Sequence, residues 1–322
     1  MAETLLEVRN LKVNFNTEAG IVRAVDGVSF AINRGETLGL VGESGCGKSV
    51  TALSLLRLIP APPGEIVAGK VLWEGKDLIE LNLPELIGIR GREISTIFQE
   101  PLTSFNPVQK IGPQISEVLQ IHIKLDPLQI REQALEMLNR AGIADPERSY
   151  EAYPHELSGG MRQRAMIAMA LSCRPQLVIA DEPTTALDVT IQAQILNLLS
   201  ELQSENKMSV LLITHNLGIV AENAQKVAVM YAGRIVELAP VRELFKNPLH
   251  PYTIGLLASI PKINQQDPLI AIPGMIPDLL HLPAGCFFEP RCPRAMERCR
   301  HEYPSETELA PGHRVSCWRV KP

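Results

Sequence analysis

The sequence predicts an α/β fold with a largely parallel sheet, antiparallel strands near the N-terminus, a helical subdomain and an irregular C-terminal part. Short apolar strands alternate with helical segments between about residues 37 and 237, a pattern that favours parallel strands joined by helices. Residues 5–15 and 22–32 alternate apolar and polar side chains, as strands do. Prolines become frequent after about residue 240. We therefore expect one domain over residues 1–240 and an extension over 241–322.

The individual elements follow from local patterns. Residues 37–41 form a short apolar strand that leads into a glycine-rich loop, and residues 49–58 are expected to form the helix behind it. A helical subdomain is expected over about residues 100–172, where residues 129–141 space their apolar side chains three to four apart. The remaining predictions are strands at residues 94–98, 177–180, 210–214, 226–231 and 234–237 and a helix at residues 189–206.

Composition and charge limit the classes of protein that the chain can be. Of its 322 residues, 45% are apolar and 21% are charged, as in an ordinary globular protein. The net charge of −5 argues against a nucleic acid bound by phosphate neutralisation. No run of eighteen apolar residues occurs, and the first residues, MAETLLEVRN, lack the apolar core of a secretory signal. We expect any role at a membrane to pass through partner subunits.

Eight residues fit the phosphate-binding pattern G-x-x-x-x-G-K-[ST]. They are Gly42, Glu43, Ser44, Gly45, Cys46, Gly47, Lys48 and Ser49, and Val50 follows them in the expected helix. The glycines allow a loop whose backbone N–H groups surround the phosphates of ATP, and the helix points its positive end at them. Lys48 is expected to reach the outer phosphates and to support hydrolysis, while the Ser49 hydroxyl binds Mg²⁺.

An acidic pair follows the apolar strand at residues 177–180. Asp181 ends this strand, so we expect its carboxylate to lie beside Mg²⁺, directly or through water. Glu182 comes next in the sequence. Such a pair is often only the start of a solvated loop, but the independent phosphate-binding pattern favours a role in a nucleotide site.

A Ser-Gly-Gly turn lies between these two motifs. Ser158, Gly159 and Gly160 precede a helix that is expected to begin near Met161, with Ser158 as its N-cap and its positive end toward an anion. This order of motifs resembles the ATPase subunit of an ABC transporter. The resemblance implies a dimer in which residues 158–161 contact the ATP of the other subunit, and in which Asp188, at the end of a D-loop-like Ala-Leu-Asp segment, lies at the interface.

The same resemblance assigns further residues around ATP. Gln99 matches the Q-loop glutamine, which contacts Mg²⁺ and the attacking water, and His215 matches the switch histidine at the γ-phosphate. Glu182 then corresponds to the general base that aligns the water. Phe15 is placed to stack on adenine, with Val25 packed on the same base.

Three residues depart from the usual pattern or add to it. Met161 stands where the family has Gln, and Asn216 stands where Asp is usual. Neither replaces a phosphate ligand, so we expect activity to survive. Cys46 lies in the phosphate-binding loop, where a helix N-terminus could lower its pKa and make the thiol oxidisable. A small filler residue is the simpler interpretation.

The C-terminal part adds a second resemblance. His250-Pro251-Tyr252-Thr253 and the segments around Cys286 and Cys292 resemble the ATP-binding subunit of the dipeptide/oligopeptide (peptide/nickel) importer family, of the D type with C-terminal iron–sulfur cysteines. This resemblance covers essentially the whole chain. It implies a second, non-identical ATPase subunit, two membrane permeases and an external peptide-binding protein as partners, at the cytoplasmic face of the cell membrane.

Four cysteines crowd the end of the chain. Cys286, Cys292, Cys299 and Cys317 have the spacing C-x5-C-x6-C-x17-C. Zinc sites favour closer pairs, whereas four thiolates at wider spacing suit a [4Fe–4S] cluster, with which the importer group associates such cysteines. His301 and His313 keep zinc possible. Disulfides come third, because a chain without a signal peptide is expected in a reducing compartment.

The function that these resemblances imply is ATP hydrolysis that energises the import of di- or oligopeptides. Import of nickel, glutathione or a sugar by the same subfamily is an alternative. A soluble ABC ATPase that acts on ribosomes or DNA is a second class. Such proteins usually carry two ATPase units, a coiled coil or a nucleic-acid-binding insert, whereas this chain has one unit and an acidic balance.

Overall fold

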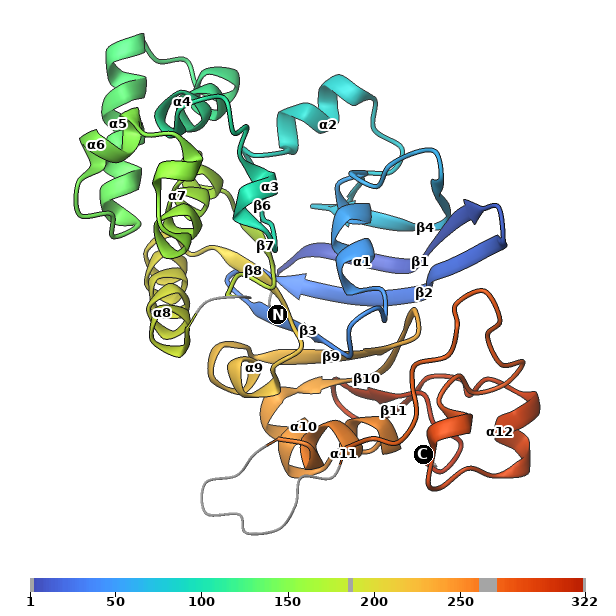
Figure 1. The fold of residues 1–322 in the computed structure, drawn as a ribbon. Helices are drawn as coiled ribbons and strands as arrows, with labels where there is room; N and C mark the ends of the chain where they lie inside the picture. Colours follow the sequence, from blue (N-terminus) through green and yellow to red (C-terminus); the bar gives the residue numbers. More distant parts are fainter. Residues whose placement is uncertain (1–2, 185–187, 261–270, 321–322) are drawn as a thin grey trace. The chain divides into compact units, whose positions relative to one another are not determined.

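The computed structural model describes residues 3–184, 188–260 and 271–320, which form two compact units. Within these described ranges, unit 1 contains residues 1–33, 37–80 and 212–322, and unit 2 contains residues 34–36 and 81–211. Unit 1 thus joins the two ends of the chain, coloured blue and orange to red in Figure 1.

The N-terminal strands of unit 1 form an antiparallel sheet. Its order is β2–β1–β4–β5, with β1 at Thr4–Thr17, β2 at Gly20–Asn33, β4 at Gly64–Trp73 and β5 at Lys76–Asp77. Val13 of β1 pairs with Val25 of β2, and both side chains are buried. The alternation of apolar residues predicts this arrangement, because successive side chains of a strand point to opposite faces.

A second sheet of unit 1 contains the strand before the glycine-rich loop. Its order in this unit is β11–β12–β10–β9–β3, with β3 at Thr37–Val41, β9 at Lys226–Tyr231, β10 at Arg234–Pro240, β11 at Thr307–Ala310 and β12 at His313–Val315. β3 and β9 are parallel, whereas the other neighbours are antiparallel. The hairpin β11–β12 was not predicted, since its pairing with β10 joins residues far apart in the proline-rich part of the chain.

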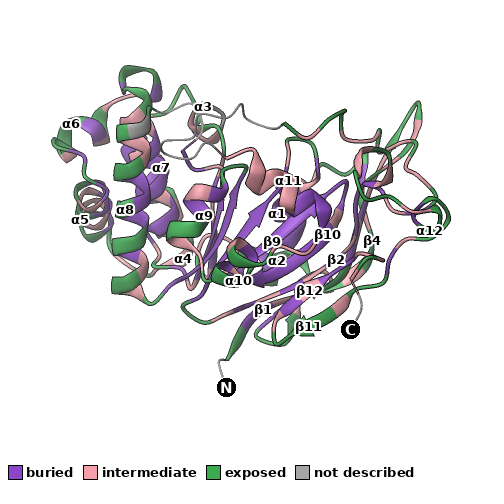
Figure 2. Cartoon of the chain, turned by 90° about the horizontal axis from the view of Figure 1, so that it is seen from below, coloured by how far each residue is buried: buried purple, intermediate pink, exposed green. Residues whose placement is uncertain are grey.

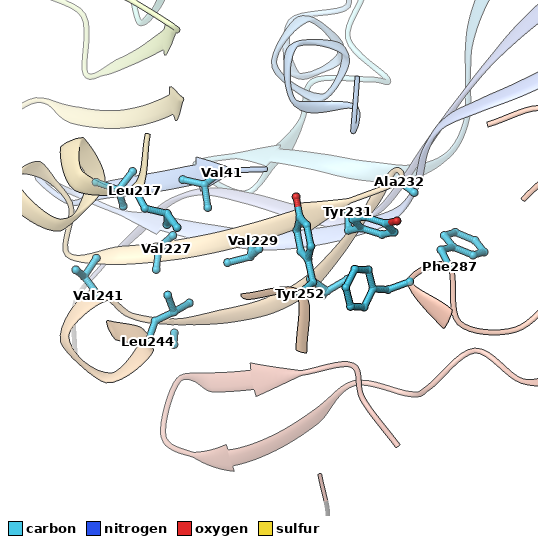
Figure 3. Close-up of a cluster of buried hydrophobic side chains, with 14 residues drawn as sticks. Val41, Leu217, Val227, Val229, Tyr231, Ala232, Val241, Leu244, Tyr252 and Phe287 are labelled. Atoms are coloured by element: carbon cyan, nitrogen blue, oxygen red, sulfur yellow. The ribbon is translucent and has the colours of Figure 1, made fainter. Parts of the chain in front are cut away.

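Short helices complete unit 1. They are α1 (Lys48–Leu55), α9 (Leu217–Asn223), α10 (Val241–Lys246), α11 (Pro251–Ala258), α12 (Glu297–His301) and the 3-10 helix η2 (Glu289–Arg291). Figure 3 shows a hydrophobic cluster in which Val41 and Val229 of the sheet pack with Leu244, Tyr252 and Phe287 of the C-terminal part. The C-terminal part therefore shares a core with the strands that carry the glycine-rich loop.

Unit 2 is mainly helical. Its helices are α2 (Leu83–Ile89), α3 (Pro101–Ser104), α4 (Ile111–His122), α5 (Pro127–Arg140), α6 (Pro146–Glu151), η1 (Pro154–Glu156), α7 (Gly159–Leu171) and α8 (Val189–Asn206). They accompany the parallel strands β6 (Ile94–Ile97) and β7 (Leu177–Asp181), and β8 (Ser209–Thr214) runs from unit 2 into unit 1.

Burial follows the expected periodicities in both units. Figure 2 shows the strands largely in purple and the outward faces of α5 and α8 in green. Helix α5 buries Ile130, Ala134 and Leu138 on one face, and a capping box between Asp126 and Gln129 closes its N-terminus. Within the described ranges, no helix is long and apolar enough to span a membrane.

Candidate functional site

The phosphate loop, residues 42–49, has no room for a side chain at two of its glycines. Gly47 has a φ of 104°, and a Cβ there would lie 2.3 Å from the carbonyl oxygen of Ala24. A Cβ at Gly42 would lie 2.2 Å from the carbonyl oxygen of Met230. The backbone of neighbouring strands therefore lies close to the loop, and a side chain at either position would displace the loop.

The loop presents a helix N-terminus and a buried ammonium group. Helix α1 begins at Lys48, and Gly47 supplies no side-chain cap, so its first N–H groups stay available to a ligand. Lys48 is 5% exposed, and its Nζ donates to the carbonyls of Gly42 at 2.9 Å and Glu43 at 3.1 Å. Ser49 and Val50 lie in the first turn of α1. The loop thus combines backbone donors with a fixed positive charge.

Cys46 behaves as a buried filler residue in this loop. It is fully buried, and burial raises the pKa of its thiol, an effect that the nearby Lys48 opposes without outweighing it. A raised pKa reduces the thiolate fraction and hence reactivity. The lowered pKa considered from the sequence is therefore wrong, and the simpler interpretation fits.

The sheet of unit 1 holds the phosphate loop through a chain of hydrogen bonds. Gly233 N–H donates to the Cys46 carbonyl at 2.8 Å, and Asp26 N–H donates to the Gly233 carbonyl at 2.8 Å. The Asp26 carboxylate accepts from Arg234 at 2.6 Å and pairs with Lys12 at 3.2 Å. Burial alone would raise the pKa of Asp26, but the hydrogen bonds and charges of Arg234 and Lys12 lower it below its ordinary value.

In unit 2, the structure brings together two of the expected catalytic side chains. Gln99 follows β6, and its Nε2 donates to Oε2 of Glu182 at 3.3 Å. Asp181 ends β7 and is 7% exposed. Glu182 adopts a φ of 45°, a left-handed conformation that is uncommon outside glycine. The amide and two carboxylates offer hard oxygen ligands and a hydrogen-bond donor at the ends of parallel strands.

The signature turn, residues 158–161, starts helix α7 as predicted. Ser158 is the N-cap, and its Oγ accepts from Met161 N–H at 3.3 Å. Ser158 and Gly159 are exposed. Buried Gln163 on the same helix donates to the carbonyl of Pro183 at 2.6 Å. Helix α7 is thereby tied to the loop that follows Asp181 and Glu182.

The interface and adenine assignments are only partly described by the structure. Asp188 is exposed and caps α8 by accepting from Ile191 N–H at 2.9 Å, while residues 186 and 187 lie outside the described residues. Phe15 is half-buried on β1, and Val25 is fully buried on β2. Their contact with adenine stays a prediction.

The switch region follows β8. His215 is exposed, and Asn216 is the N-cap of α9, where its side chain accepts from Gly218 N–H at 2.9 Å. An Asn before a helix is a frequent cap. Asn216, which stands where the family usually has Asp, therefore caps α9, and an uncharged amide is sufficient for this role.

The four C-terminal cysteines line one cavity of about 20 Å³, which we call the four-cysteine cavity. Its walls include Cys286, Cys292, Cys299 and Cys317, together with His250, Phe288 and Trp318. Burial raises the pKa of three of the thiols, that of Cys286 to about 12, and the neighbouring cysteines add to each increase. The backbone N–H groups of Phe288, Arg294 and Arg319 oppose this rise in pKa without outweighing it.

Two residues that the sequence did not assign contact the phosphate loop. Arg291 forms an ion pair with the Glu43 side chain, and the Tyr252 hydroxyl accepts from Glu43 N–H. The sequence marks Tyr252 only as part of the motif His250-Pro251-Tyr252-Thr253. Arg291 precedes Cys292, and nothing in the local sequence predicts its ion pair with Glu43.

A phosphate loop, an acidic strand end and a capped Ser-Gly-Gly helix start define a nucleotide-binding cassette. A family model described as "ABC transporter" matches residues 25–185, and one described as "Oligopeptide/dipeptide transporter, C-terminal region" matches residues 236–299. The chain belongs to the ABC transporter family of ATP-binding proteins, and its fold and ATPase class are those predicted.

Known proteins resemble the chain over most of its length. It is 53% identical to a probable peptide ABC transporter ATP-binding protein, y4tR, of Sinorhizobium fredii, over 99% of this chain and 96% of that protein. It is 50% identical to the dipeptide transport ATP-binding protein DppD of Bacillus subtilis, over 98% and 95%. The solved ATP-binding cassette MJ0796, dimeric and bound to ADP and phosphate, covers 74% of this chain and 99% of its own, with 26% identity and a TM-score of 0.67.

Proposed function

We propose that this protein hydrolyses ATP to energise the import of di- or oligopeptides through a membrane transporter. The observation that carries this proposal is the pairing, in one chain, of an ABC cassette with a C-terminal region of the oligopeptide/dipeptide transporter type. Relatives at 50% identity or more are named for peptide or dipeptide transport. These names favour peptides over nickel, glutathione or sugars as the transported substrate.

Hydrolysis is assigned to the residues of the nucleotide motifs. Lys48 and the N–H groups of α1 bind the phosphates, while Phe15 and Val25 contact adenine. Ser49, Asp181 and Gln99 supply the oxygen ligands that Mg²⁺ prefers. Glu182, which accepts from Gln99, positions the attacking water and takes its proton, and His215 contacts the γ-phosphate.

The signature turn is assigned to the ATP of a second ATPase subunit. Its exposed Ser158 and Gly159 and the start of α7 offer backbone donors to an anion. Gly160, Met161 and Asp188 complete this surface. We infer a non-identical second ATPase, two permeases and an external peptide-binding protein as partners, at the cytoplasmic face of the membrane. Nucleic acid is not among them. In this scheme residues 1–240 form the ATPase domain, with a helical subdomain at about 100–172, and residues 241–322 form the extension.

The four-cysteine cavity is assigned to a [4Fe–4S] cluster, which would supply a redox-active or stabilising centre. In the described part of the chain, no group of three His, Cys, Asp or Glu side chains is placed to hold a metal ion, and this applies to zinc and to a cluster alike. The donor chemistry is what supports the cluster, because four thiols line one cavity and four thiolates are the ligand set of a [4Fe–4S] centre.

Elemental analysis of anaerobically purified protein tests this assignment. We expect iron with acid-labile sulfide, lost in Cys292→Ser and retained in Cys173→Ser, which alters a cysteine outside the cavity. Colourless protein that contains zinc and no iron would contradict the cluster.

Glu182→Gln tests the catalytic assignment. We expect kcat to fall by about 10²- to 10⁴-fold, because the general base is lost, while ATP affinity is kept and an ATP-bound dimer accumulates. Glu201→Gln, at an exposed site on α8, is the matched control and should hydrolyse ATP normally. Labelled peptide uptake by the reconstituted transporter tests the substrate class, and uptake of nickel or glutathione instead of peptide would exclude it.

A further inference from the structure

Arg291 holds the Glu43 side chain of the phosphate loop in a two-point ion pair. Its Nη1 donates to Oε2 at 2.8 Å and its Nη2 to Oε1 at 3.1 Å. The Arg291 side chain is 6% exposed and that of Glu43 is 28% exposed, so solvent screens the pair only partly. Arg291 also donates to the Pro273 carbonyl at 2.8 Å. The guanidinium group is thus fixed from both sides.

Tyr252 holds the backbone of the same residue. Its hydroxyl accepts from Glu43 N–H at 3.0 Å, and its ring is fully buried against Tyr231 at 4.6 Å and Phe288 at 5.4 Å between ring centres. Figure 3 shows Tyr252 beside Tyr231 within the hydrophobic cluster. Burial raises the pKa of Tyr252, so the phenol stays protonated. Side chain and backbone of Glu43 therefore both have fixed partners.

Both partners of Glu43 adjoin the four-cysteine cavity. Arg291 precedes Cys292 at the end of η2. Phe288, which packs on Tyr252, lines the cavity, as does His250, whose ring accepts from Tyr252 N–H at 3.1 Å and caps α11. The cavity and the phosphate loop are thus joined by two short paths of direct contacts within unit 1.

We propose that Arg291 and Tyr252 are positioning residues for ATP binding, and that through them the four cysteines set the affinity of the phosphate loop for nucleotide. This inference rests on the proposed ATPase function. Its physical basis is twofold. The contacts fix the loop residue whose carbonyl accepts from Lys48, and the guanidinium neutralises a carboxylate that would otherwise repel an incoming polyphosphate.

Nucleotide affinity of purified full-length protein tests the positioning role. We expect Arg291→Ala to raise the Kd and KM for ATP about tenfold, with kcat nearly unchanged, since the contacts act on nucleotide binding. Arg291→Lys should restore part of the affinity, because it keeps the charge but not the two-point geometry. Arg242→Ala is the matched control, an exposed arginine on α10. A merely structural role would lower the melting temperature and active fraction without shifting the Kd.

A second set of variants keeps the inference testable where Arg291→Ala folds poorly. Tyr252→Phe removes only the hydroxyl and should raise the Kd for ATP severalfold. In a Glu43→Ala background, Arg291→Ala should add little, because its partner is already absent. An unchanged Kd in both single variants, or equal effects of Arg291→Ala with and without Glu43, would overturn the positioning role.

The link to the cysteines has its own readout. Cys292→Ser should raise the Kd for ATP in the wild-type background and leave it unchanged in a background that carries both Arg291→Ala and Tyr252→Phe. If Cys292→Ser binds ATP like the wild type, the cavity does not set the affinity. Wild-type protein that binds no ATP would instead refute the proposed function, so the two failures are distinguishable.

Discussion

The phosphate loop and the signature turn both end in a helix N-terminus, but they are built differently. Gly47 caps α1 without a side chain, at a φ of 104° and in a place where an added Cβ would lie 2.3 Å from the carbonyl oxygen of Ala24. Ser158 caps α7 with its own hydroxyl at an exposed site, and a Cβ at the following Gly159 would meet nothing within 4 Å. Tertiary packing holds the first, whereas a local hydrogen bond holds the second.

This difference teaches how each helix start can be used. A loop held by its surroundings keeps its donors oriented before ligand arrives, so little entropy is lost on binding. A turn that satisfies its own N–H group through Ser158 is stable while it faces water. It can then meet an anion brought by a partner, as the proposed dimer requires.

Gly47→Ala is the variant that should separate the two most strongly. The methyl group of an alanine at position 47 would meet the Ala24 carbonyl, and the alanine would have to adopt a left-handed φ. Because the phosphate loop would then be displaced from its ligand, we expect ATP affinity to fall by about 100-fold or more. Gly45→Ala is the matched control, because Gly45 has a φ of 80° but open space around it. Equal losses in both variants would mean that backbone conformation alone, and not packing, holds the phosphate loop.

Ser158→Ala should have a smaller and different effect. Loss of the cap hydrogen bond should lower the free energy of unfolding by about 1 kcal/mol. ATP binding to the isolated subunit should stay unchanged, while hydrolysis in the assembled transporter falls about tenfold. Ser158→Asp retains a cap acceptor and should keep the stability but not the activity, because it places a negative charge before an anion site. Reduced ATP binding by isolated Ser158→Ala would contradict the assignment to a partner's nucleotide.

The motifs that the sequence predicted are those in which chemistry is encoded by local order. The phosphate loop lies between β3 and α1, and Ser158 caps α7, as expected, because glycine, serine and hydrophobic spacing act over a few residues. The contact of Gln99 with Glu182 depends on strands β6 and β7 lying side by side, and it was not predicted, since the family resemblance placed both residues at the attacking water without pairing them.

The contacts of the C-terminal part were beyond the sequence. Hairpin β11–β12 pairs with β10, and buried Glu237 accepts from His313 at 2.8 Å and from His250 N–H at 2.9 Å. Arg291 likewise reaches a residue 248 positions away in the chain. Such contacts depend on the packed core rather than on local spacing, so proline content alone predicted an irregular segment.

The smallest effect concerns the support of the phosphate loop by Asp26. Its pKa is lowered in the folded state from an ordinary value of 3.8. The Asp26 pairs should therefore stabilise the fold fully above this value and lose their contribution as the pH falls below it. Asp26→Asn should lower the free energy of unfolding by about 1 kcal/mol at pH 7, with the difference from wild type shrinking toward pH 3. Denaturant titrations at several pH values would measure it.

Glu65→Gln offers the matched control for this pH dependence. Glu65 is an exposed carboxylate on the same antiparallel sheet, so its removal should change the free energy of unfolding little at any pH. A constant Asp26→Asn difference from pH 7 to pH 3 would show that the carboxylate charge contributes nothing. In that case only the backbone hydrogen bonds through Gly233 would hold the phosphate loop. The phosphate loop would then differ from the locally capped signature turn in its main-chain packing and not in its ion pairs.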